Sequence, residues 1–235
     1  MKEISRRAFV GRAIAVGTAS AVLAEAVPAQ LVWQKSEWKI AEFEQLVNNA
    51  ARIKQVYDVK QIDGGRFLNN VKNSLNGLRF GFGVPKAQIK IAVGMHGPAN
   101  MLNYDDYIWN KYRIGEWLSV ADSATGKPAV TNPFYKSKGV PENEPASTDP
   151  DNEGSMYQET SIQTLQSRGV QFLSCHTATE EQARALIRRN KLSQSPEDVV
   201  KDMLAHTVPG VLVVAAMVAA IALLQAEGRY TYIAV

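Results

Sequence analysis

The sequence predicts an α/β protein in which helices flank a mostly parallel β-sheet. Five short apolar or alternating runs are typical of strands: 53–62, 89–97, 170–176, 208–216 and 229–235. Stretches with helical periodicity separate them, and strands that alternate with helices pair in parallel, with helices on both faces of the sheet. These elements account for residues 53–235, which is long enough for one domain with a sizeable core.

The first half of the chain supplies two of the strands and two helices. Residues 30–52 place apolar side chains at roughly helical spacing and are expected to form a lead-in helix that Ser36 caps. Residues 66–78 follow the Asp63-Gly64-Gly65 turn and are expected to form an amphipathic helix. Its apolar face comprises Phe67, Leu68, Val71, Leu75 and Leu78. The run 89–97 is more apolar, as expected of a strand inside a sheet.

An insertion at about 113–156 interrupts the alternation of strands and helices. Before it, residues 99–115 are expected to form a helix with an aromatic face, so Trp109, Tyr112 and Trp117 are expected to pack rather than to line a pocket. The insertion is rich in Pro, Gly, Ser and acidic residues without apolar periodicity, which is typical of a long loop. We expect its acidic residues to form a solvated charge run: Glu142, Glu144, Asp149, Asp151 and Glu153.

Helices connect the later strands. They are expected at 157–169, 177–190, 195–207 and 217–228. Thr177 or Thr179 would cap the second of these helices, and Ser195 would cap the third. The run from Val211 to Leu224 is apolar throughout but shorter than the roughly 20 residues that a spanning helix needs. We therefore expect a buried strand followed by a buried helix there.

The first residues have the pattern of an export signal. Ser5-Arg6-Arg7 is followed by Phe9 and a weakly apolar run, which is similar to the S-R-R-x-F-L signal of the twin-arginine pathway. Small residues favour cleavage after Ala29, so 1–29 is predicted to be a signal peptide. The protein is then expected to be exported folded to the periplasm or outside the cell, with no stable membrane span once the signal is removed.

Charge and cysteine content exclude several classes of function. The net charge is +3, and residues 1–29 contribute four basic and two acidic residues, so the mature chain carries +1 and has no concentrated basic patch for nucleic acid. The single cysteine excludes an intramolecular disulfide, C-x-x-C redox chemistry and c-type haem attachment. No pair of histidines has ligand spacing on one element, so no metal and no cofactor are expected, and His206 is interpreted as a charge near a helix C-terminus.

Two chemically active residues end strands. In a parallel sheet the carboxyl ends of the strands share one edge, where ligands bind, so His96 and Cys175 would share that rim if their strands are neighbours. Cys175 also precedes a helix start, whose N–H groups favour a thiolate, and a protonated His96 or His176 would add to this effect. Cys175 and His96 are therefore the candidate catalytic residues, and Gly97 and His176 the candidate ligand-binding residues. The alternative is that Cys175 is buried and inert and that His96 only holds its loop.

Three segments together resemble the DsrE/DsrF-like family, small α/β proteins of sulfur metabolism. "IKIAVGMHGPA" (89–99) is similar to the family's second strand with its His-Gly-Pro run, and "GVQFLSCHTA" (169–178) to the strand that ends in the family's cysteine. The closing segment 208–235 has a Pro-Gly, a valine strand, a short helix ending in Leu-Gln-x-x-Gly and a Tyr-containing strand. The likeness covers about 53–112 and 157–235.

This resemblance implies a DsrE-like fold and a role in sulfur relay. Family members with the cysteine carry a persulfide on it and pass the sulfur to a partner protein, and they commonly assemble as trimers or hexamers. Carried over to this chain, Cys175 becomes the sulfur carrier and His96 its neighbour. The expected function is thus an exported protein that binds or relays sulfane sulfur. The alternative is a noncatalytic ligand-binding or assembly protein that uses the rim and the 113–156 insertion.

Overall fold

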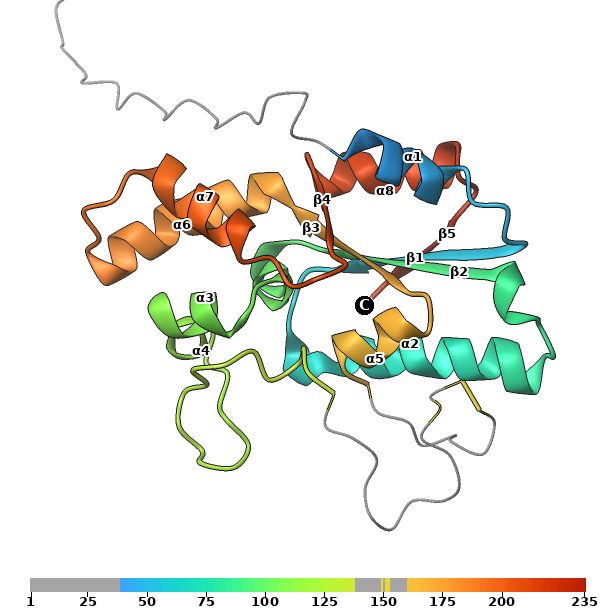
Figure 1. Ribbon diagram of the computed structural model, residues 1–235, viewed down its shortest axis with the longest axis horizontal. Helices are drawn as coiled ribbons and strands as arrows, with labels where there is room; N and C mark the ends of the chain where they lie inside the picture. The colour runs from blue at the N-terminus through green and yellow to red at the C-terminus, as the bar shows by residue number, and fades with distance from the viewer. Residues whose placement is uncertain (1–38, 138–148, 150, 153–159) are drawn as a thin grey trace, which may run out of the picture. The chain divides into compact units, whose positions relative to one another are not determined.

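Five parallel strands form one sheet in the order β4-β3-β2-β1-β5 (Figure 1). They are β1 (Ile53–Val59), β2 (Ile89–Met95), β3 (Gln171–Cys175), β4 (Leu212–Val214) and β5 (Thr231–Ala234). All four strand pairings are parallel. The predicted α/β class is therefore confirmed, and β2 and β3, the strands that lead to His96 and Cys175, are neighbours.

The computed structural model describes residues 39–137, 149, 151–152 and 160–235. The predicted signal peptide at 1–29, the start of the lead-in helix with its Ser36 cap, and Glu142, Glu144 and Glu153 lie outside these residues.

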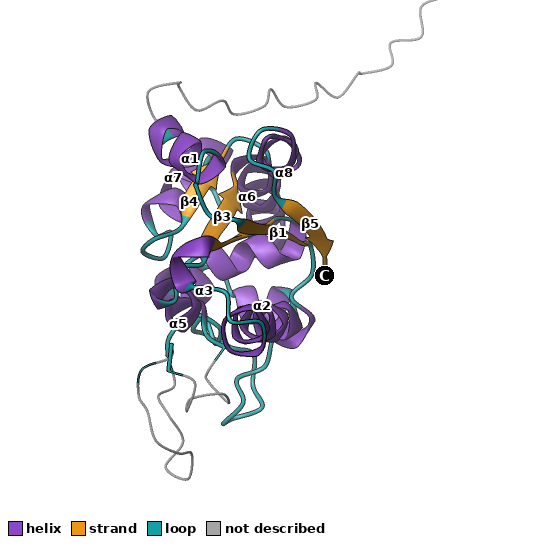
Figure 2. Ribbon diagram, turned by 90° about the vertical axis from the view of Figure 1, so that its right-hand side faces the viewer, coloured by secondary structure: helices purple, strands orange, loops and turns teal. Residues whose placement is uncertain are grey.

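Helices cover both faces of the sheet (Figures 1 and 2). One face carries α2 (Arg66–Asn76) and α5 (Ile162–Ser167), and the other carries α1 (Ile40–Val47) and α8 (Met217–Ala226). The chain runs β1, β2, β3, β4 in one direction across the sheet, and α8 then crosses back to place β5 beside β1. Right-handed crossovers put α2 and α5, the helices of the first two connections, and α8 on opposite sides (Figure 1), because the direction of travel reverses.

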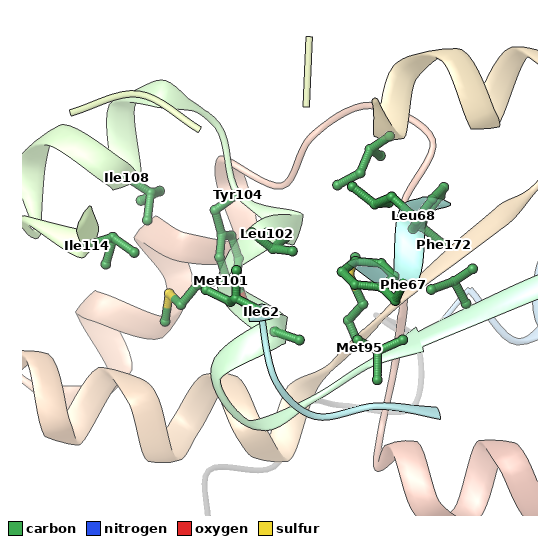
Figure 3. Close-up of a cluster of buried hydrophobic side chains, with 14 of the residues drawn as sticks. Ile62, Phe67, Leu68, Met95, Met101, Leu102, Tyr104, Ile108, Ile114 and Phe172 are labelled. Carbon is green, nitrogen blue, oxygen red and sulfur yellow. The ribbon is translucent and has the colours of Figure 1, made fainter. Parts of the chain in front are cut away.

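Each face of the sheet has its own hydrophobic cluster. The larger one packs alternate side chains of β1 and β2, such as Val59 and Val93, against the predicted apolar face of α2. Figure 3 shows part of it, with Phe67 and Leu68 of α2 near Met95 and Phe172 of the sheet. The smaller cluster packs the opposite side chains of the same strands against α1 and α8, and Cys175 belongs to it.

The segment after β2 is not one helix as predicted. It forms a 3-10 helix, η5 (Gly97–Asn103), and two short helices, α3 (Asp106–Lys111) and α4 (Ile114–Trp117). Helix continuity is lost at Tyr104, which is extended, and Asp105 caps α3 by accepting hydrogen bonds from the amides of Tyr107 and Ile108. The aromatic residues of this segment pack as expected: Trp109 and Tyr112 are fully buried, and Trp117 packs against the larger cluster.

The remaining helices lie between β3 and β4 and in the turns. Helix α6 (His176–Asn190) packs on α7 (Pro196–Ala205) and on η5. Ser195 caps α7 as predicted, whereas α6 is capped by Cys175 itself and not by Thr177 or Thr179. The short turns are η2 (Asp63–Gly65), η3 (Gly77–Gly81) and η4 (Lys86–Gln88).

The described part of the insertion is tied to the core. Ala129 is buried in the larger cluster, and the side-chain amide of Asn132 donates to the carbonyls of Leu102 and Tyr104. Asp151 forms ion pairs with three cations, Arg79, Lys86 and Arg168. The expectation of a solvated charge run is therefore wrong for Asp151.

The described helices include none that is both long and apolar enough to cross a membrane. The apolar run from Val211 to Leu224 is divided between β4 and α8, as the sequence predicted.

Candidate functional site at the carboxyl edge of the sheet

Cys175 is the last residue of β3, at the carboxyl edge of the sheet. Ligands of open α/β sheets bind at this edge. After β3 the chain enters α6, whose Ala178 is buried in the smaller cluster and whose Ala183 and Leu186 are buried in the larger one. After β4 it enters α8, which belongs to the smaller cluster.

The thiol of Cys175 accepts hydrogen bonds from the first turns of two helices. The amide of Ala178 in α6 lies 3.4 Å from Sγ, and the amide of Met217, the first residue of α8, lies 3.3 Å from it. The first N–H groups of a helix have no partner within the helix, and they carry the positive end of its dipole. Two such groups converging on one sulfur atom stabilise negative charge there. Cys175 is only 5% exposed, so water competes little for these amides.

A buried amide side chain fixes the backbone at Cys175. The Oδ1 atom of Asn100 accepts hydrogen bonds from the amide of Cys175 at 2.9 Å and from the hydroxyl of Ser174 at 3.0 Å. Its Nδ2 atom donates to Thr179 and to Gln182 of α6. Asn100 thereby joins η5, the end of β3 and α6, and it holds the strand-to-helix turn that presents the thiol to both helices.

His96 lies on the neighbouring strand and is bound to a carboxylate. Its Nε2 atom is 2.7 Å from Oδ1 of Asp58, which lies near the end of β1. The other carboxylate oxygen of Asp58 accepts a hydrogen bond of 2.6 Å from the hydroxyl of Tyr232 on β5, and Nζ of Lys60 lies 3.5 Å from it. The His96 side chain remains 18% exposed, so it is accessible from the rim.

Charge favours the ionised form of Asp58. Burial raises the pKa of Asp58, but hydrogen bonds from Tyr232 and His96 and the charges of His96 and Lys60 outweigh it and hold the pKa below its usual value. The hydrogen bond to Asp58 in turn raises the pKa of Tyr232, so its hydroxyl keeps its proton and donates it to the carboxylate.

Gly97 allows the backbone turn that follows His96. Its φ of 53° lies in the left-handed region, and a Cβ atom there would lie 3.1 Å from the carbonyl oxygen of Lys60. The Gly97 carbonyl accepts a hydrogen bond of 2.6 Å from the side chain of Gln182. Glycine is thus required for the turn that follows His96, whatever binds at the rim.

The other two histidines pair with carboxylates other than Asp58. His176 is the first residue of α6 and is buried, with Nδ1 3.2 Å from Oε1 of Glu180. His206 caps the C-terminus of α7, close to the position that the sequence predicted, and there Nδ1 lies 3.0 Å from Oδ2 of Asp105 and the ring stacks on Tyr107. The structure therefore brings His96, and not His176 or His206, to the open part of the rim.

Sequence reasoning missed Asp58, Tyr232 and Asn100. The sequence did offer a signal for Asp58. It lies at the buried, otherwise apolar end of a strand, and a buried carboxylate needs hydrogen-bond partners or ion pairs. Tyr232 becomes its partner only because β5 adds beside β1, which the sequence does not reveal.

Within the described residues, no group of three or more His, Cys, Asp or Glu side chains is arranged to hold a metal ion. The chemistry available at the rim is that of a thiol between two helix starts and a carboxylate-bound imidazole. Comparison of the chain with protein-family models, with curated proteins and with solved structures found no match.

Proposed function

We propose that this chain is an exported, DsrE-like protein that binds or relays sulfane sulfur on Cys175. The observation that carries the proposal is the pair of helix-start amides that donate to Sγ. A thiolate is both the nucleophile in sulfur transfer and an anion, and N–H donors at helix starts favour it.

The transfer itself needs no cofactor. The Cys175 thiolate attacks the outer sulfur of a donor persulfide, R–S–SH. A new S–S bond forms at Sγ while the S–S bond of the donor breaks, and the thiolate R–S⁻ leaves. The number of S–S bonds is unchanged, so no external oxidant or reductant is consumed. Passing the sulfur on to an acceptor thiol is the same step in reverse.

Access to Cys175 narrows the choice of donor. The thiol is nearly buried, so the reacting end of the donor must be slim, as in inorganic polysulfide or a persulfide on an extended segment of a partner protein. Assembly into a homo-oligomer, trimer or hexamer, is part of the proposal. It is supported by the exposed apolar face of α8, where Val218 is 70% exposed. Export by the twin-arginine pathway is supported by the sequence motif of 1–29.

A noncatalytic role is the second candidate, and one observation favours it. The Cys175 sulfur caps α6, and a buried thiol that caps a helix needs no reactivity to be useful. On this alternative the protein holds a ligand or partner at the rim and the insertion, and its function survives replacement of Cys175.

The two candidates differ in what happens to the thiol of the folded protein. We would incubate the folded protein with inorganic polysulfide and measure its intact mass, with Cys175→Ala and Cys175→Ser as controls. Sulfur relay predicts a gain of one or more sulfur atoms that thiol reductants reverse and that both variants lack. A thiol that gains no sulfur and reacts with iodoacetamide only after denaturation contradicts relay and favours the noncatalytic role.

A further inference from the structure

Three strands contribute one hydrogen-bonded chain of side chains at the rim. Tyr232 of β5 donates to Asp58 of β1, and Asp58 binds Nε2 of His96, which directly follows β2. Each link is short, at 2.6 Å and 2.7 Å, and Asp58 is buried. The ring of His96 is therefore held in one orientation by a carboxylate that is itself held from its other side.

Strand register places this chain beside Cys175. Met95 of β2 pairs with Ser174 of β3, so the next residues along the two strands, His96 and Cys175, lie side by side. Side chains alternate across a strand, and Ala92 and Leu173 both face the α8 side of the sheet. His96 and Cys175 follow them by even numbers of residues, and they share that face.

The hydrogen bonds of His96 determine which ring nitrogen is a base. Asp58 is ionised near neutral pH, because its partners hold its pKa below the usual value. A carboxylate only accepts hydrogen bonds, so Nε2 of His96 carries the proton between them. In the neutral ring, Nδ1 is then the atom with a free lone pair, and it is the one that accepts a proton.

The groups that face His96 are few. Among the described residues, Asp58 of β1 binds the ring, Tyr232 of β5 and Lys60 bind Asp58, and the strand register places Cys175 of β3 beside His96. Helix α8, which covers this face, contains no ionisable side chain between Met217 and Ala226. In the part of the chain that the structure describes, the carboxylate that binds the His96 ring is that of Asp58.

We propose that Asp58 and Tyr232 are positioning residues of the Cys175 site, which hold His96 so that its Nδ1 carries the proton of the sulfur transfer. The inference rests on the proposed function of Cys175.

The Sγ proton moves to Nδ1, and the thiolate attacks the outer sulfur of R–S–SH. The leaving thiolate R–S⁻ then takes the proton from Nδ1 and departs as R–SH. Asp58 stays ionised and stabilises the imidazolium between the two transfers.

The test compares two reactions of Cys175 as a function of pH, from about pH 5 to 8, where histidine titrates. One reaction is sulfur loading from inorganic polysulfide, followed by intact mass, and the other is alkylation by iodoacetamide. The variants are Asp58→Asn, Tyr232→Phe and His96→Gln, with His96→Ala for rescue by added imidazole. A matched control is Asp105→Asn, which alters a second aspartate–histidine pair and keeps a side chain that caps α3.

Loss of a positioned acid–base group costs about 100-fold or more in rate. We therefore expect His96→Gln to slow loading by about 100-fold and to remove the contribution of the imidazole to the pH profile, which leaves only the dependence on thiol ionisation. Asp58→Asn should slow loading about tenfold or more, Tyr232→Phe a few-fold, and Asp105→Asn not at all. Added imidazole should restore part of the rate in His96→Ala, which a merely structural histidine would not allow.

The outcomes separate this inference from the function on which it rests. If the protein and its Asp58→Asn and His96→Gln variants load sulfur at equal rates with equal pH profiles, the positioning role is wrong and sulfur relay stands. If no form loads sulfur but alkylation still depends on Asp58 and His96, these residues position a proton acceptor for the Cys175 thiol, and sulfur relay is wrong. If neither reaction depends on these residues and no sulfur is gained, both are wrong. Should Asp58→Asn fail to fold, Tyr232→Phe and the imidazole experiment decide in the same way.

Discussion

The amide of Met217 donates a hydrogen bond of 3.3 Å to the sulfur of Cys175, so the first residue of α8 is bound to the last residue of β3. The two residues are 42 positions apart in the sequence, and the contact exists because β4 pairs with β3 in parallel. The same sulfur caps α6 through Ala178. One side chain thus fixes the starts of two helices, and any change at Cys175 affects both structure and chemistry.

Replacing Cys175 with alanine should therefore destabilise the fold as well as remove the thiol. Cys175→Ala leaves the amides of Ala178 and Met217 without their acceptor, and we expect a loss of about 1–2 kcal/mol in the free energy of unfolding. Cys175→Ser keeps an acceptor and should lose less. Urea unfolding of the two variants measures the difference. Equal stability of Cys175→Ala and the unaltered protein would show that neither hydrogen bond contributes.

The amide of Asn100 should be among the most sensitive positions in the protein. Asn100→Ala removes the acceptor of the Cys175 amide and of the Ser174 hydroxyl and the donor to Gln182, all in a fully buried setting. Each buried group left without a partner costs about 1–3 kcal/mol, and partial relaxation of the network reduces the sum. We therefore expect the free energy of unfolding to fall by about 2–4 kcal/mol.

Asn69→Ala is the matched control, because it makes the same substitution on the exposed face of α2, where the asparagine side chain is in contact with solvent. It should leave the midpoint of urea unfolding nearly unchanged. Similar losses for both variants would contradict a special role for the buried network.

These positions show what the sequence could and could not reveal. The rim location of His96 and Cys175 follows from the rule that parallel strands end at one edge, and the strand runs were visible in the sequence. The partners Asp58, Tyr232 and Asn100 depend on strand order and on the path of η5, which local periodicity does not encode. The expected helix at 99–115 is broken for a related reason, because the backbone at Asn103, Tyr104 and Asp105 pairs with the segment after α7, and Asp105 caps a new helix.

The ion-pair cluster of Asp151 should make stability depend on acid pH. Burial raises the pKa of Asp151, but its hydrogen bonds and ion pairs with Lys86, Arg168 and Arg79 outweigh it and hold the pKa below the usual value. A carboxylate with a depressed pKa contributes stability in full above its unfolded value of about 4. That contribution is lost as the pH falls through the lower pKa of the folded state.

Asp151→Asn should remove this contribution. We expect the free energy of unfolding to fall by about 2 kcal/mol at neutral pH. This is less than the roughly 3–5 kcal/mol that breaking a fully buried ion pair costs, because Lys86 is half exposed. The loss should shrink as the pH falls below about 4, since both proteins then lack the charge. Urea unfolding across this range measures it, with Asp63→Asn in the exposed Arg66 pair as control. A loss that stays constant down to low pH would contradict the electrostatic account.

Gly94 sets how closely α8 approaches the sheet next to the Cys175 site. A Cβ atom at this position would lie 2.5 Å from Sδ of Met217 and 3.2 Å from its Cγ, so Gly94→Ala must displace the Met217 side chain. Overpacking of this kind costs about 1–3 kcal/mol, and it should also move the Met217 amide away from Sγ and expose the thiol to iodoacetamide. The double variant Gly94→Ala/Met217→Ala removes the clash while it keeps the backbone amide. It should bring the alkylation rate back toward that of the unaltered protein, and a rate that stays high would show that Met217 does not transmit the effect.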